Sequence, residues 1–191
     1  MTNGSTIDFS NFFKPSTKKE QFDLSAIISE ILKILEPQLL ENSISYSITC
    51  KTHNMTFRSI TEIIPCDATL IMTYKSHIAH VMLNILNNAK DAIIAKKLSG
   101  LLDATGNGTI NIDVSREGEA LKLSISDNGG GIPEDLIDKI FDPYFTTKSK
   151  NQGTGIGLYI SKVIVEEKLG GKIYVRNIHN GAEFTIELPC L

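Results

Sequence analysis

Asp127-Asn-Gly-Gly-Gly-Ile132 and Gly153-Thr-Gly-Ile-Gly157 are two glycine clusters near the C-terminus, and Phe141-Asp-Pro-Tyr-Phe-Thr-Thr-Lys148 lies between them. Glycine lets backbone N–H groups approach a phosphate closely, and the second cluster directly precedes a helical pattern. Because an asparagine-rich helix also comes before the first cluster, this stretch predicts a nucleotide-binding site.

The helix predicted over residues 75–97 carries an unusual polar face. His80, Asn84 and Asn88 recur at a spacing of four residues, and Asp91 continues the same face. Asparagine is a poor helix former, and a merely solvated face is usually rich in lysine and glutamate. Asparagine side-chain oxygens are suitable Mg²⁺ ligands. We therefore interpret this face as functional rather than simply solvated.

The glycine clusters suggest separate contacts with base and phosphate. Asp127 ends a predicted strand, where its carboxylate can accept a hydrogen bond from an exocyclic amine such as adenine N6; the alternative is an ordinary turn. Gly155 and Gly157 open a helix, so its free N–H groups would face a phosphate. Lys148 could add a positive charge there, or it could be a solvated lysine of a loop that its ligand orders.

Hydrophobic periodicity predicts an α+β fold. Helices are expected at 25–40, with Ser25 as N-cap and Pro37 bending or ending the helix, at 75–97, and at 157–169, ended by Gly170-Gly171. Strands are expected at 22–24, 44–50, 109–114, 121–126, 172–175 and 182–188, with one or two more within 56–64; the strands at 172–175 and 182–188 are joined by a turn at Asn180-Gly181. Because helices and strands mix without strict alternation, we expect one mixed sheet with helices on one face.

Composition limits the possible functions. The 191 residues are 41% hydrophobic, enough for a core, and the net charge of −3 disfavours nucleic-acid binding. Cys50, Cys66 and Cys190 are widely separated and lack metal-ligand spacing, so they are interpreted as reduced cytosolic thiols. No apolar run approaches the length that spans a bilayer. We expect a cytoplasmic segment without membrane contact, although a parent protein could be membrane-anchored.

The first 21 residues differ from the rest of the chain. Residues 1–5 resemble a leader, residues 6–13 are a short amphipathic piece, and Lys14-Pro15 begins a linker. We interpret residues 1–21 as a leader, the stub of a preceding dimerisation helix and a linker, and residues 22–191 as the folded domain.

Taken together, these motifs resemble the catalytic ATP-binding domain of sensor histidine kinases, within the superfamily that also contains gyrase, chaperone and mismatch-repair ATPases. The resemblance rests on five segments: Leu83–Ala89 (N box), Asp127–Ile132 (first glycine box), Phe141–Lys148 (F box), Gly153–Leu158 (second glycine box) and Gly181–Pro189 (closing strand). The sequence of the F box is similar to that of the nitrogen-regulator subgroup of these kinases.

The resemblance implies a Bergerat-type two-layer α/β sandwich, with a mixed, mostly antiparallel sheet covered by helices on one face, that binds ATP and Mg²⁺. Asn88 would be the principal Mg²⁺ ligand with Asn84 assisting, and these two residues with Lys148 would be catalytic. The implied nucleotide-binding residues are Asn84, Asn88, Asp91, Asp127, Gly129, Gly131, Ile132, Thr147, Lys148, Gly153, Thr154, Gly155, Ile156, Gly157, Leu158 and Thr185.

One feature favours phosphoryl transfer over hydrolysis, and a departure from the family pattern indicates that the acceptor lies elsewhere. ATP-hydrolysing relatives such as gyrase carry a glutamate four residues before the Mg²⁺ asparagine, where this chain has Asn84. None of His53, His77, His80 and His179 lies in the family's phosphoacceptor motif. The resemblance therefore implies transfer of the γ-phosphoryl group to a histidine on the kinase's phosphoacceptor dimerisation domain, with a response regulator receiver domain downstream. Two alternatives stay open: a serine kinase of the anti-sigma-factor type, and an ATP-gated binding module without chemistry.

Overall fold

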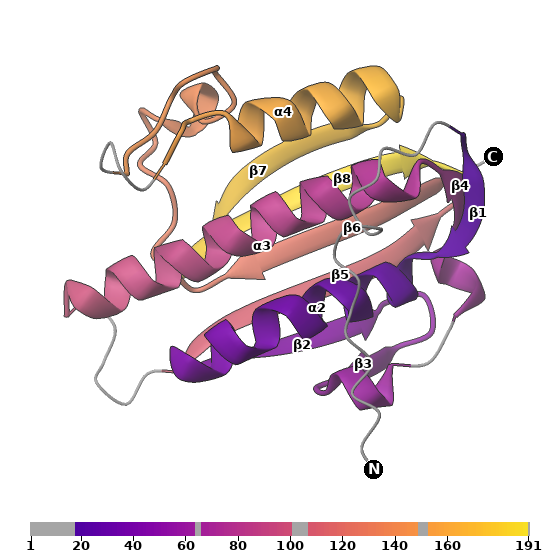
Figure 1. Cartoon of the computed structure of the whole chain (residues 1–191), viewed down its shortest axis with the longest axis horizontal. Helices are drawn as coiled ribbons and strands as arrows, with labels where there is room; N and C mark the ends of the chain where they lie inside the picture. Colours follow the sequence, from indigo (N-terminus) through magenta and orange to yellow (C-terminus); the bar gives the residue numbers. More distant parts are fainter. Residues whose placement is uncertain (1–17, 64–65, 101–106, 149–152, 191) are drawn as a thin grey trace, which may run out of the picture.

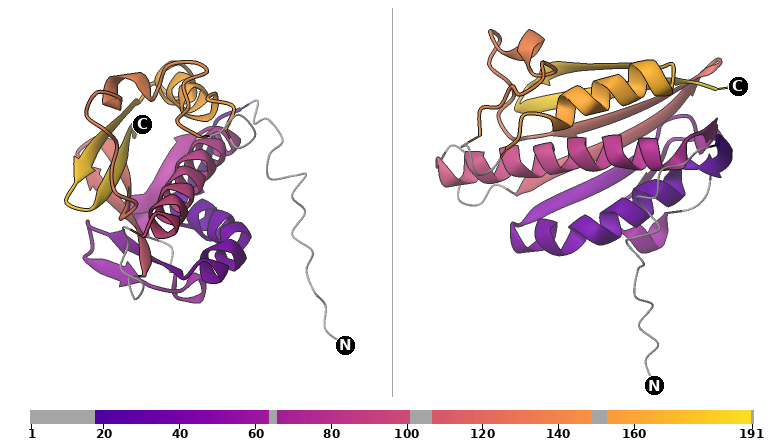
Figure 2. Two further views of the ribbon diagram at one scale, coloured as in Figure 1. Left: turned by 90° about the vertical axis from the view of Figure 1, so that its left-hand side faces the viewer. Right: turned by 45° about the horizontal axis from the view of Figure 1, so that its top comes forward.

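The computed structural model describes residues 18–63, 66–100, 107–148 and 153–190. A six-stranded sheet forms one layer and three helices cover one of its faces (Figures 1 and 2). The sheet contains β2 (Ile44–Cys50), β3 (Met55–Phe57), β5 (Gly108–Glu117), β6 (Ala120–Asp127), β7 (Lys172–Ile178) and β8 (Gly181–Pro189). The helices are α2 (Leu24–Glu41), α3 (Lys75–Leu98) and α4 (Gly157–Val163). Residues 1–17, and with them the expected stub of a dimerisation helix, lie outside the described residues.

The strand order β3-β2-β5-β6-β8-β7 confirms the predicted mixed sheet. β2 pairs with β5 in parallel, whereas the other neighbours in this sheet are antiparallel. β5 and β6 form the expected hairpin, in which Gly118 adopts φ +60°. The left-handed backbone there suits glycine because it has no Cβ.

A second, two-stranded sheet joins β1 (Glu20–Asp23) to β4 (Leu70–Thr73). The brief strand expected near residue 22 is therefore confirmed, and its partner lies outside the main sheet. The strand expected over 56–64 is shorter, because β3 ends at Phe57 and the 3-10 turn η1 (Ile60–Glu62) follows. Ser59 accepts a hydrogen bond from the Thr61 N–H and so starts this turn.

The prediction that Ser25 caps α2 is wrong. The N-cap is Asp23, whose Oδ1 accepts a hydrogen bond of 2.8 Å from the Ser25 N–H. Pro37 lies inside the helix without ending it. Proline lacks a backbone donor, but this proline is exposed, while Leu35 and Leu39 on either side are buried in the core and hold the helix together.

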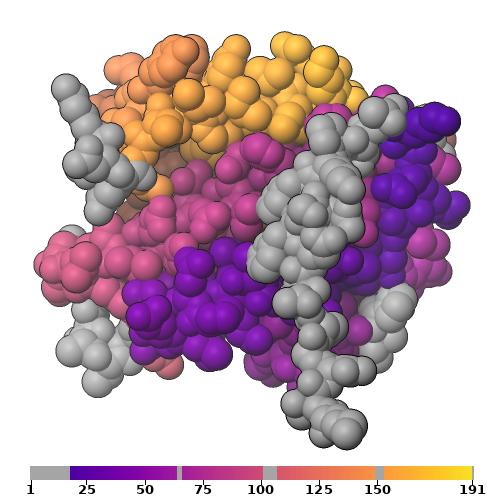
Figure 3. All heavy atoms as spheres, viewed as in Figure 1, coloured from indigo at the N-terminus to yellow at the C-terminus, as the bar shows by residue number. Residues whose placement is uncertain are grey.

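The core lies between α2, α3 and the inner face of the sheet. As the periodicity predicts, α3 buries one apolar face, consisting of Ile78, Met82, Ile85, Leu86, Ala89 and Ile93. Figure 3 shows the outer side of this layer, where α3 runs between α2 and the surface formed by α4 and the segment before it. The polar face of α3 is therefore directed toward α4 and solvent rather than the sheet.

The third predicted helix is confirmed over nearly its full length. α4 ends at Val163 and the chain continues as a π-helical segment, η4 (Ile164–Lys168), before Gly170 adopts φ +68°. Two short turns complete the described structure, η2 (Asp67–Thr69) and η3 (Ile137–Lys139). Within the described ranges, no helix is both long enough and apolar enough to cross a membrane.

Candidate nucleotide site

Asn84 connects the polar face of α3 to the beginning of α4. Its Nδ2 donates hydrogen bonds of 3.3 Å to the Gly157 carbonyl and 3.3 Å to Ser161 Oγ. Ser161 is fully buried and also donates to the Gly157 carbonyl at 2.9 Å. The amide of Asn84 is thus fixed against the second glycine cluster. Ser161 was not predicted as a site residue, because one serine in a helical pattern gives no signal.

Asn88 and Asp91 contact the same lysine. Lys148 Nζ lies 2.7 Å from Asp91 Oδ2 and 3.2 Å from Asn88 Oδ1. Both side chains of the ion pair remain about one-third exposed, at 34% for Lys148 and 39% for Asp91. The predicted polar face therefore holds a cation against one amide oxygen and one carboxylate oxygen. His80, on the same face, is exposed.

Asp127 lies at the end of β6, with only 6% of its surface exposed. Its Oδ1 accepts a hydrogen bond of 2.7 Å from the Gly129 N–H. Burial raises the pKa of Asp127, while backbone hydrogen bonds from Gly129 and Ala182 and the charge of Lys96 act in the opposite direction. A carboxyl group in this setting is desolvated and oriented, as recognition of a base edge requires.

The first glycine cluster lies directly against α3. A Cβ at Gly129 would come within 2.7 Å of the Ala92 Cβ and 2.9 Å of the Ala92 carbonyl carbon. A Cβ at Gly181, across from Asp127, would lie only 1.8 Å from the Asp127 carbonyl oxygen. Neither position has room for a side chain, so the backbone at the end of β6 packs tightly between α3 and β8.

Asn177 of β7 fixes the far side of this cluster. Its Oδ1 accepts a hydrogen bond of 2.8 Å from the Ile132 N–H, and its Nδ2 donates one of 2.7 Å to the Ile132 carbonyl. Gly131 adopts φ +81°, and a Cβ there would lie 2.8 Å from Asn177 Oδ1. The clamp by Asn177 was missed from sequence, because it depends on the tertiary position of β7.

The structure does not bring Thr185 together with Asp127. Thr185 pairs with Ser124 in the β6–β8 register, and their hydroxyl oxygens lie 3.1 Å apart. Because side chains alternate along a strand, the position of Asp127, three residues beyond Ser124, is on the other face of the sheet. Ala182 lies nearer, since its backbone donates to the Asp127 carboxyl group.

The lid segment, defined here as residues 141–148 and 153–157, is anchored at its beginning. The Phe141 ring makes an edge-to-face contact with Phe184 of β8, with centroids 6.4 Å apart. Lys162 Nζ lies 5.6 Å from the Phe141 ring centroid. These contacts fix the F box to the core and to α4.

The second glycine cluster packs against the F box. Gly155 adopts φ +67°, and a Cβ there would lie 2.5 Å from the Tyr144 carbonyl carbon. A Cβ at Gly153 would lie 2.8 Å from Thr146 Oγ1. Gly157 leaves space beside Asn84, whose side-chain atoms begin 3.6 Å from its hypothetical Cβ.

The remaining predicted residues of the lid segment differ in exposure. Thr147 and Thr154 are exposed, Ile156 occupies the N-cap position of α4, and Leu158 packs against the core. The two halves of the segment therefore meet close to the polar face of α3, where Lys148 reaches Asn88. Backbone N–H groups, amide oxygens and one ammonium group are concentrated there, a chemistry that suits a magnesium-bound polyphosphate.

The chain matches one described protein family. The model of the family "Histidine kinase-, DNA gyrase B-, and HSP90-like ATPase" matches residues 73–191. The sensor histidine kinase ZraS of Escherichia coli K12 is 33% identical over 181 residues, which is 90% of this chain and 36% of ZraS. The nitrogen regulation protein NtrY of Azorhizobium caulinodans is 40% identical over 94 residues, 49% of this chain and 11% of NtrY. The chain thus spans about a third of the length of ZraS.

Solved structures give the same similarity. The nucleotide-free catalytic domain of histidine kinase ThkA has a TM-score of 0.68 at 28% identity, over 91% of this chain and 97% of that one. ThkA has also been solved in complex with the response regulator protein TrrA, and there the match has a TM-score of 0.67 at 25% identity, over 91% of this chain and 42% of the ThkA chain. The predicted two-layer fold is therefore confirmed.

Proposed function

This chain belongs to the family of histidine kinase-, DNA gyrase B- and HSP90-like ATPases and is an ATP-binding catalytic domain of the sensor histidine kinase type. We propose that it transfers the γ-phosphoryl group of ATP to a histidine on a separate phosphoacceptor domain. The observation that carries this proposal is the position of Lys148. Its Nζ bridges Asn88 and Asp91 on α3 and so draws the lid segment to the predicted phosphate site.

Asp127 would hold the adenine base. Its buried carboxyl group is oriented by the N–H groups of Gly129 and Ala182, and its oxygens, with two lone pairs each, retain capacity to accept a hydrogen bond from the exocyclic amine. Gly129, Gly131 and Ile132 would border the base, with Asn177 fixing the Ile132 backbone. Thr185 is left out of this proposal because it lies on the opposite face of the sheet.

Asn88 would hold Mg²⁺, assisted by Asn84. The side-chain oxygen of Asn88 is suited to such an ion, because an amide oxygen is a hard, neutral ligand. It already accepts a hydrogen bond of 3.2 Å from the cationic Lys148 Nζ. When bound, the ion would offset negative charge on the phosphate oxygens. Asn84 positions its amide by bonding to the start of α4.

Lys148 and the second glycine cluster would bind the phosphates. The lysine ammonium is exposed enough to exchange Asp91 for a phosphate oxygen, since an ion pair in water is worth only about 0–1 kcal/mol. Gly153, Gly155 and Gly157 keep the backbone free of side chains, and Thr147 and Thr154 lie on the exposed side of the lid segment. These groups would stabilise negative charge on the transferred phosphoryl group.

Transfer is favoured over hydrolysis by the chemistry at position 84. A general base takes a proton from the attacking water, and the amide of Asn84 cannot do so. His77 and His80 lie on α3 itself, and His179 lies in the turn between β7 and β8. We therefore propose that the accepting imidazole belongs to the dimerisation domain of the parent kinase, and that a response regulator receiver domain accepts the phosphoryl group next. The solved complex of ThkA with the response regulator protein TrrA supports a response regulator as a partner.

The test mixes the 191-residue chain with γ-labelled ATP and Mg²⁺, and with the dimerisation domain of its parent kinase. We expect label on the added domain that is labile in acid and stable in base, as phosphohistidine is. Label that is stable in acid would indicate phosphoserine and the anti-sigma-factor type of kinase. Nucleotide binding without any labelled protein would leave only an ATP-gated binding module.

A further inference from the structure

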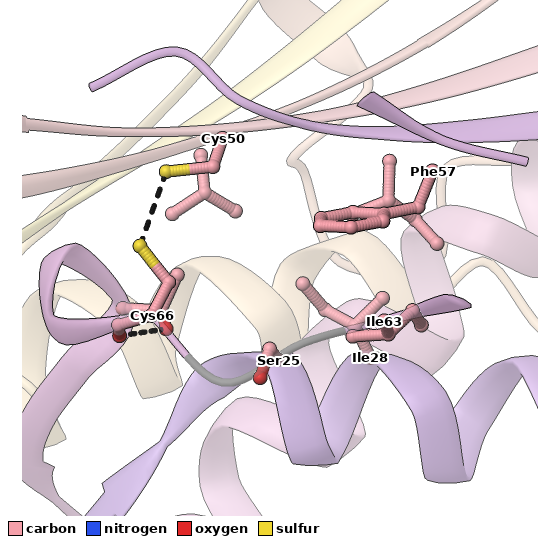
Figure 4. A pocket seen from close by; sticks show the side chains of 9 residues that line it. Ser25, Ile28, Cys50, Phe57, Ile63 and Cys66 are labelled. Carbon is pink, nitrogen blue, oxygen red and sulfur yellow. Dashed lines mark hydrogen bonds between the residues drawn. The ribbon is translucent and has the colours of Figure 1, made fainter. Parts of the chain in front are cut away.

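Two cysteines and one histidine that are distant in sequence meet at the far end of β2. Cys50 is the last residue of β2, His53 lies in the turn between β2 and β3, and Cys66 immediately precedes η2. The Cys50 and Cys66 sulfur atoms lie 3.3 Å apart, and His53 Nδ1 lies 3.5 Å from Cys50 Sγ and 3.0 Å from Cys66 Sγ. We call this group the Cys50–His53–Cys66 cluster. Figure 4 shows the two sulfur atoms pointing toward each other.

We propose that the Cys50–His53–Cys66 cluster binds a zinc ion through two thiolates and one imidazole. Two sulfurs and one nitrogen are a ligand set typical of zinc, and three protein ligands leave a position for water. In a tetrahedral zinc site the sulfur ligands would lie about 3.7 Å apart and a sulfur and a nitrogen about 3.5 Å apart. The contacts in the cluster are within about 0.5 Å of these spacings, so a small outward shift of the side chains admits the ion.

The histidine has the outer partner that a zinc ligand needs. His53 Nε2, the nitrogen not directed at the sulfurs, lies 3.4 Å from Asp67 Oδ1. A carboxylate at this position accepts a hydrogen bond from the Nε2–H group, which keeps the proton on Nε2 and leaves the Nδ1 lone pair free for a metal. Asp67 is itself exposed, so the cluster opens toward solvent on the histidine side and an ion can enter.

Hydrogen bonds hold the chain at Cys66 and at Thr52, on either side of the cluster. Asp23, which caps α2, accepts hydrogen bonds from the Cys66 N–H at 3.3 Å and from the Thr69 hydroxyl group. On the histidine side, Thr52 Oγ1 accepts a hydrogen bond of 2.9 Å from the Arg116 N–H of β5. A preformed site loses little conformational entropy when it binds its ion.

Apolar side chains cover the buried side of the cluster. A small cavity of about 20 Å³ beside the sulfurs is lined by Ile28, Ile48, Phe57, Ile63 and Val114, together with Ser25, Thr69 and the two cysteines. A cavity of this size has room for about one water molecule, so no larger ligand fits on the buried side of the cluster.

A disulfide between Cys50 and Cys66 is the main competing explanation of the cluster, because their sulfur atoms lie 3.3 Å apart. The cobalt titration of the reduced protein separates the disulfide from the metal.

The zinc site would be independent of the nucleotide site. Cys50 pairs with Val114 near the end of β5, whereas Asp127 pairs with Ile110 near its start. An ion here would cross-link the β2–β3 turn to the segment before η2, which Asp23 ties to the start of α2. The ion would stabilise this end of the fold, and ATP binding should not depend on it.

The experiment loads the full 191-residue chain, reduced and stripped of metal, with Co²⁺ and then with Zn²⁺. We expect a sulfur-to-cobalt charge-transfer band that saturates at one ion per chain and disappears when zinc displaces cobalt. We also expect Zn²⁺, at about a hundredfold excess over its Kd, to raise the Tm by about 5 °C. ATP affinity should stay the same with and without zinc.

Matched variants locate the ion. Cys66→Ser should abolish the charge-transfer band, and His53→Ala should weaken zinc affinity at least about tenfold. The control variants Cys190→Ser and His179→Ala should retain the charge-transfer band and the zinc affinity. Because His53 is exposed, its variant keeps the test valid if a cysteine variant fails to fold. Absence of the band in reduced protein, or zinc affinity unchanged in both His53→Ala and Cys66→Ser, would overturn the proposal. So would a Cys50–Cys66 disulfide that persists under reducing conditions and leaves only one free thiol.

Discussion

Lys148 Nζ in the lid segment lies 2.7 Å from Asp91 Oδ2 on α3, and the same ammonium group lies 3.2 Å from Asn88 Oδ1. Lys148 thus contacts the Asn88 oxygen that we assign to Mg²⁺. The same contacts join the lid segment to α3 at the proposed phosphate site. Binding of MgATP would replace these contacts with phosphate oxygens.

Lys148→Ala should weaken ATP binding more than ADP binding, because the lysine is assigned to the terminal phosphate. We expect a loss of about tenfold for ATP, the size of one charge-assisted hydrogen bond, and a smaller loss for ADP. Stability should change by less than about 1 kcal/mol, since the ion pair is about one-third exposed. Calorimetric titration checks both nucleotides, with the exposed Lys139→Ala as control. Equal losses for ATP and ADP would refute the assignment.

Asn88→Ala should remove the magnesium dependence of ATP binding. The adjacent Asn87 provides the control, because its Oδ1 accepts a hydrogen bond from Lys90 at 3.1 Å and takes no part in the contacts with Lys148. The ATP affinity is measured once with Mg²⁺ and once with a chelator. The two affinities should differ for the wild type and for Asn87→Ala, and they should be equal for Asn88→Ala. A magnesium effect that persists in Asn88→Ala would contradict the ligand assignment.

Asp127→Asn should weaken ATP and ADP alike while leaving the fold intact. Asparagine retains an oxygen for the Gly129 N–H but loses the charge that strengthens a bond to the adenine amine, so we expect a loss of about tenfold. If ADP affinity survives, Asp127 is only a turn residue. GTP, which presents a carbonyl oxygen where adenine has an amine, should bind poorly to the wild type.

The same substitution should change how stability depends on pH. Because burial raises the folded-state pKa of Asp127, its contribution to stability is complete below its unfolded pKa and is lost as the pH rises through the folded pKa. The amide introduced by Asp127→Asn does not titrate, so the Tm of the variant relative to the wild type should increase as the pH rises across the acid range. Thermal scans of both proteins from acid to neutral pH measure this difference; a Tm difference that does not change with pH would show that the carboxylate is not destabilising there.

Gly129→Ala should destabilise the domain and weaken nucleotide binding, because the added methyl group would lie 2.7 Å from the Ala92 Cβ. Overpacking of this kind costs about 1–3 kcal/mol. Ala92→Gly removes the opposing methyl group, so the double variant should recover part of the stability, as measured by urea unfolding. Recovery should be incomplete, since the Ala92 carbonyl carbon also lies within 2.9 Å. No difference between the single and double variants would mean that the contact is relieved elsewhere.

Local pattern was sufficient to predict most of the fold. The period of the apolar residues on α3 predicted both its length and its buried face, and the alternation around Gly118 predicted the β5–β6 hairpin. The N-cap of α2 was placed two residues late, because Asp23 and Ser25 are both good capping residues and only the backbone decides between them.

The part of the site that lies on a single helix could be predicted from the sequence. Asn84, Asn88 and Asp91 share a helix face by spacing alone, and the contacts of all three with α4 or the lid segment agree with that expectation. Asn177 and Ser161 gave no signal, because their roles depend on which strand or helix packs beside them. Thr185 was misplaced for a similar reason, since the face on which a strand residue lies depends on the register with β6.

The cysteines show the same limit of sequence spacing. Cys50 and Cys66 are too far apart along the chain to form a recognisable metal motif, yet the path of the chain from β2 through β3 to η2 brings their sulfurs to 3.3 Å. Only the tertiary structure identifies His53 as the third member of the cluster.

The fate of the γ-phosphate tests the central claim most directly. We predict that the chain alone, with MgATP, releases inorganic phosphate very slowly, and that adding the dimerisation domain of the parent kinase moves γ-label, but not α-label, onto a histidine of that domain. Rapid phosphate release by the chain alone, with no phosphohistidine on the added domain, would contradict the account and would mean that water, rather than a histidine, is the acceptor.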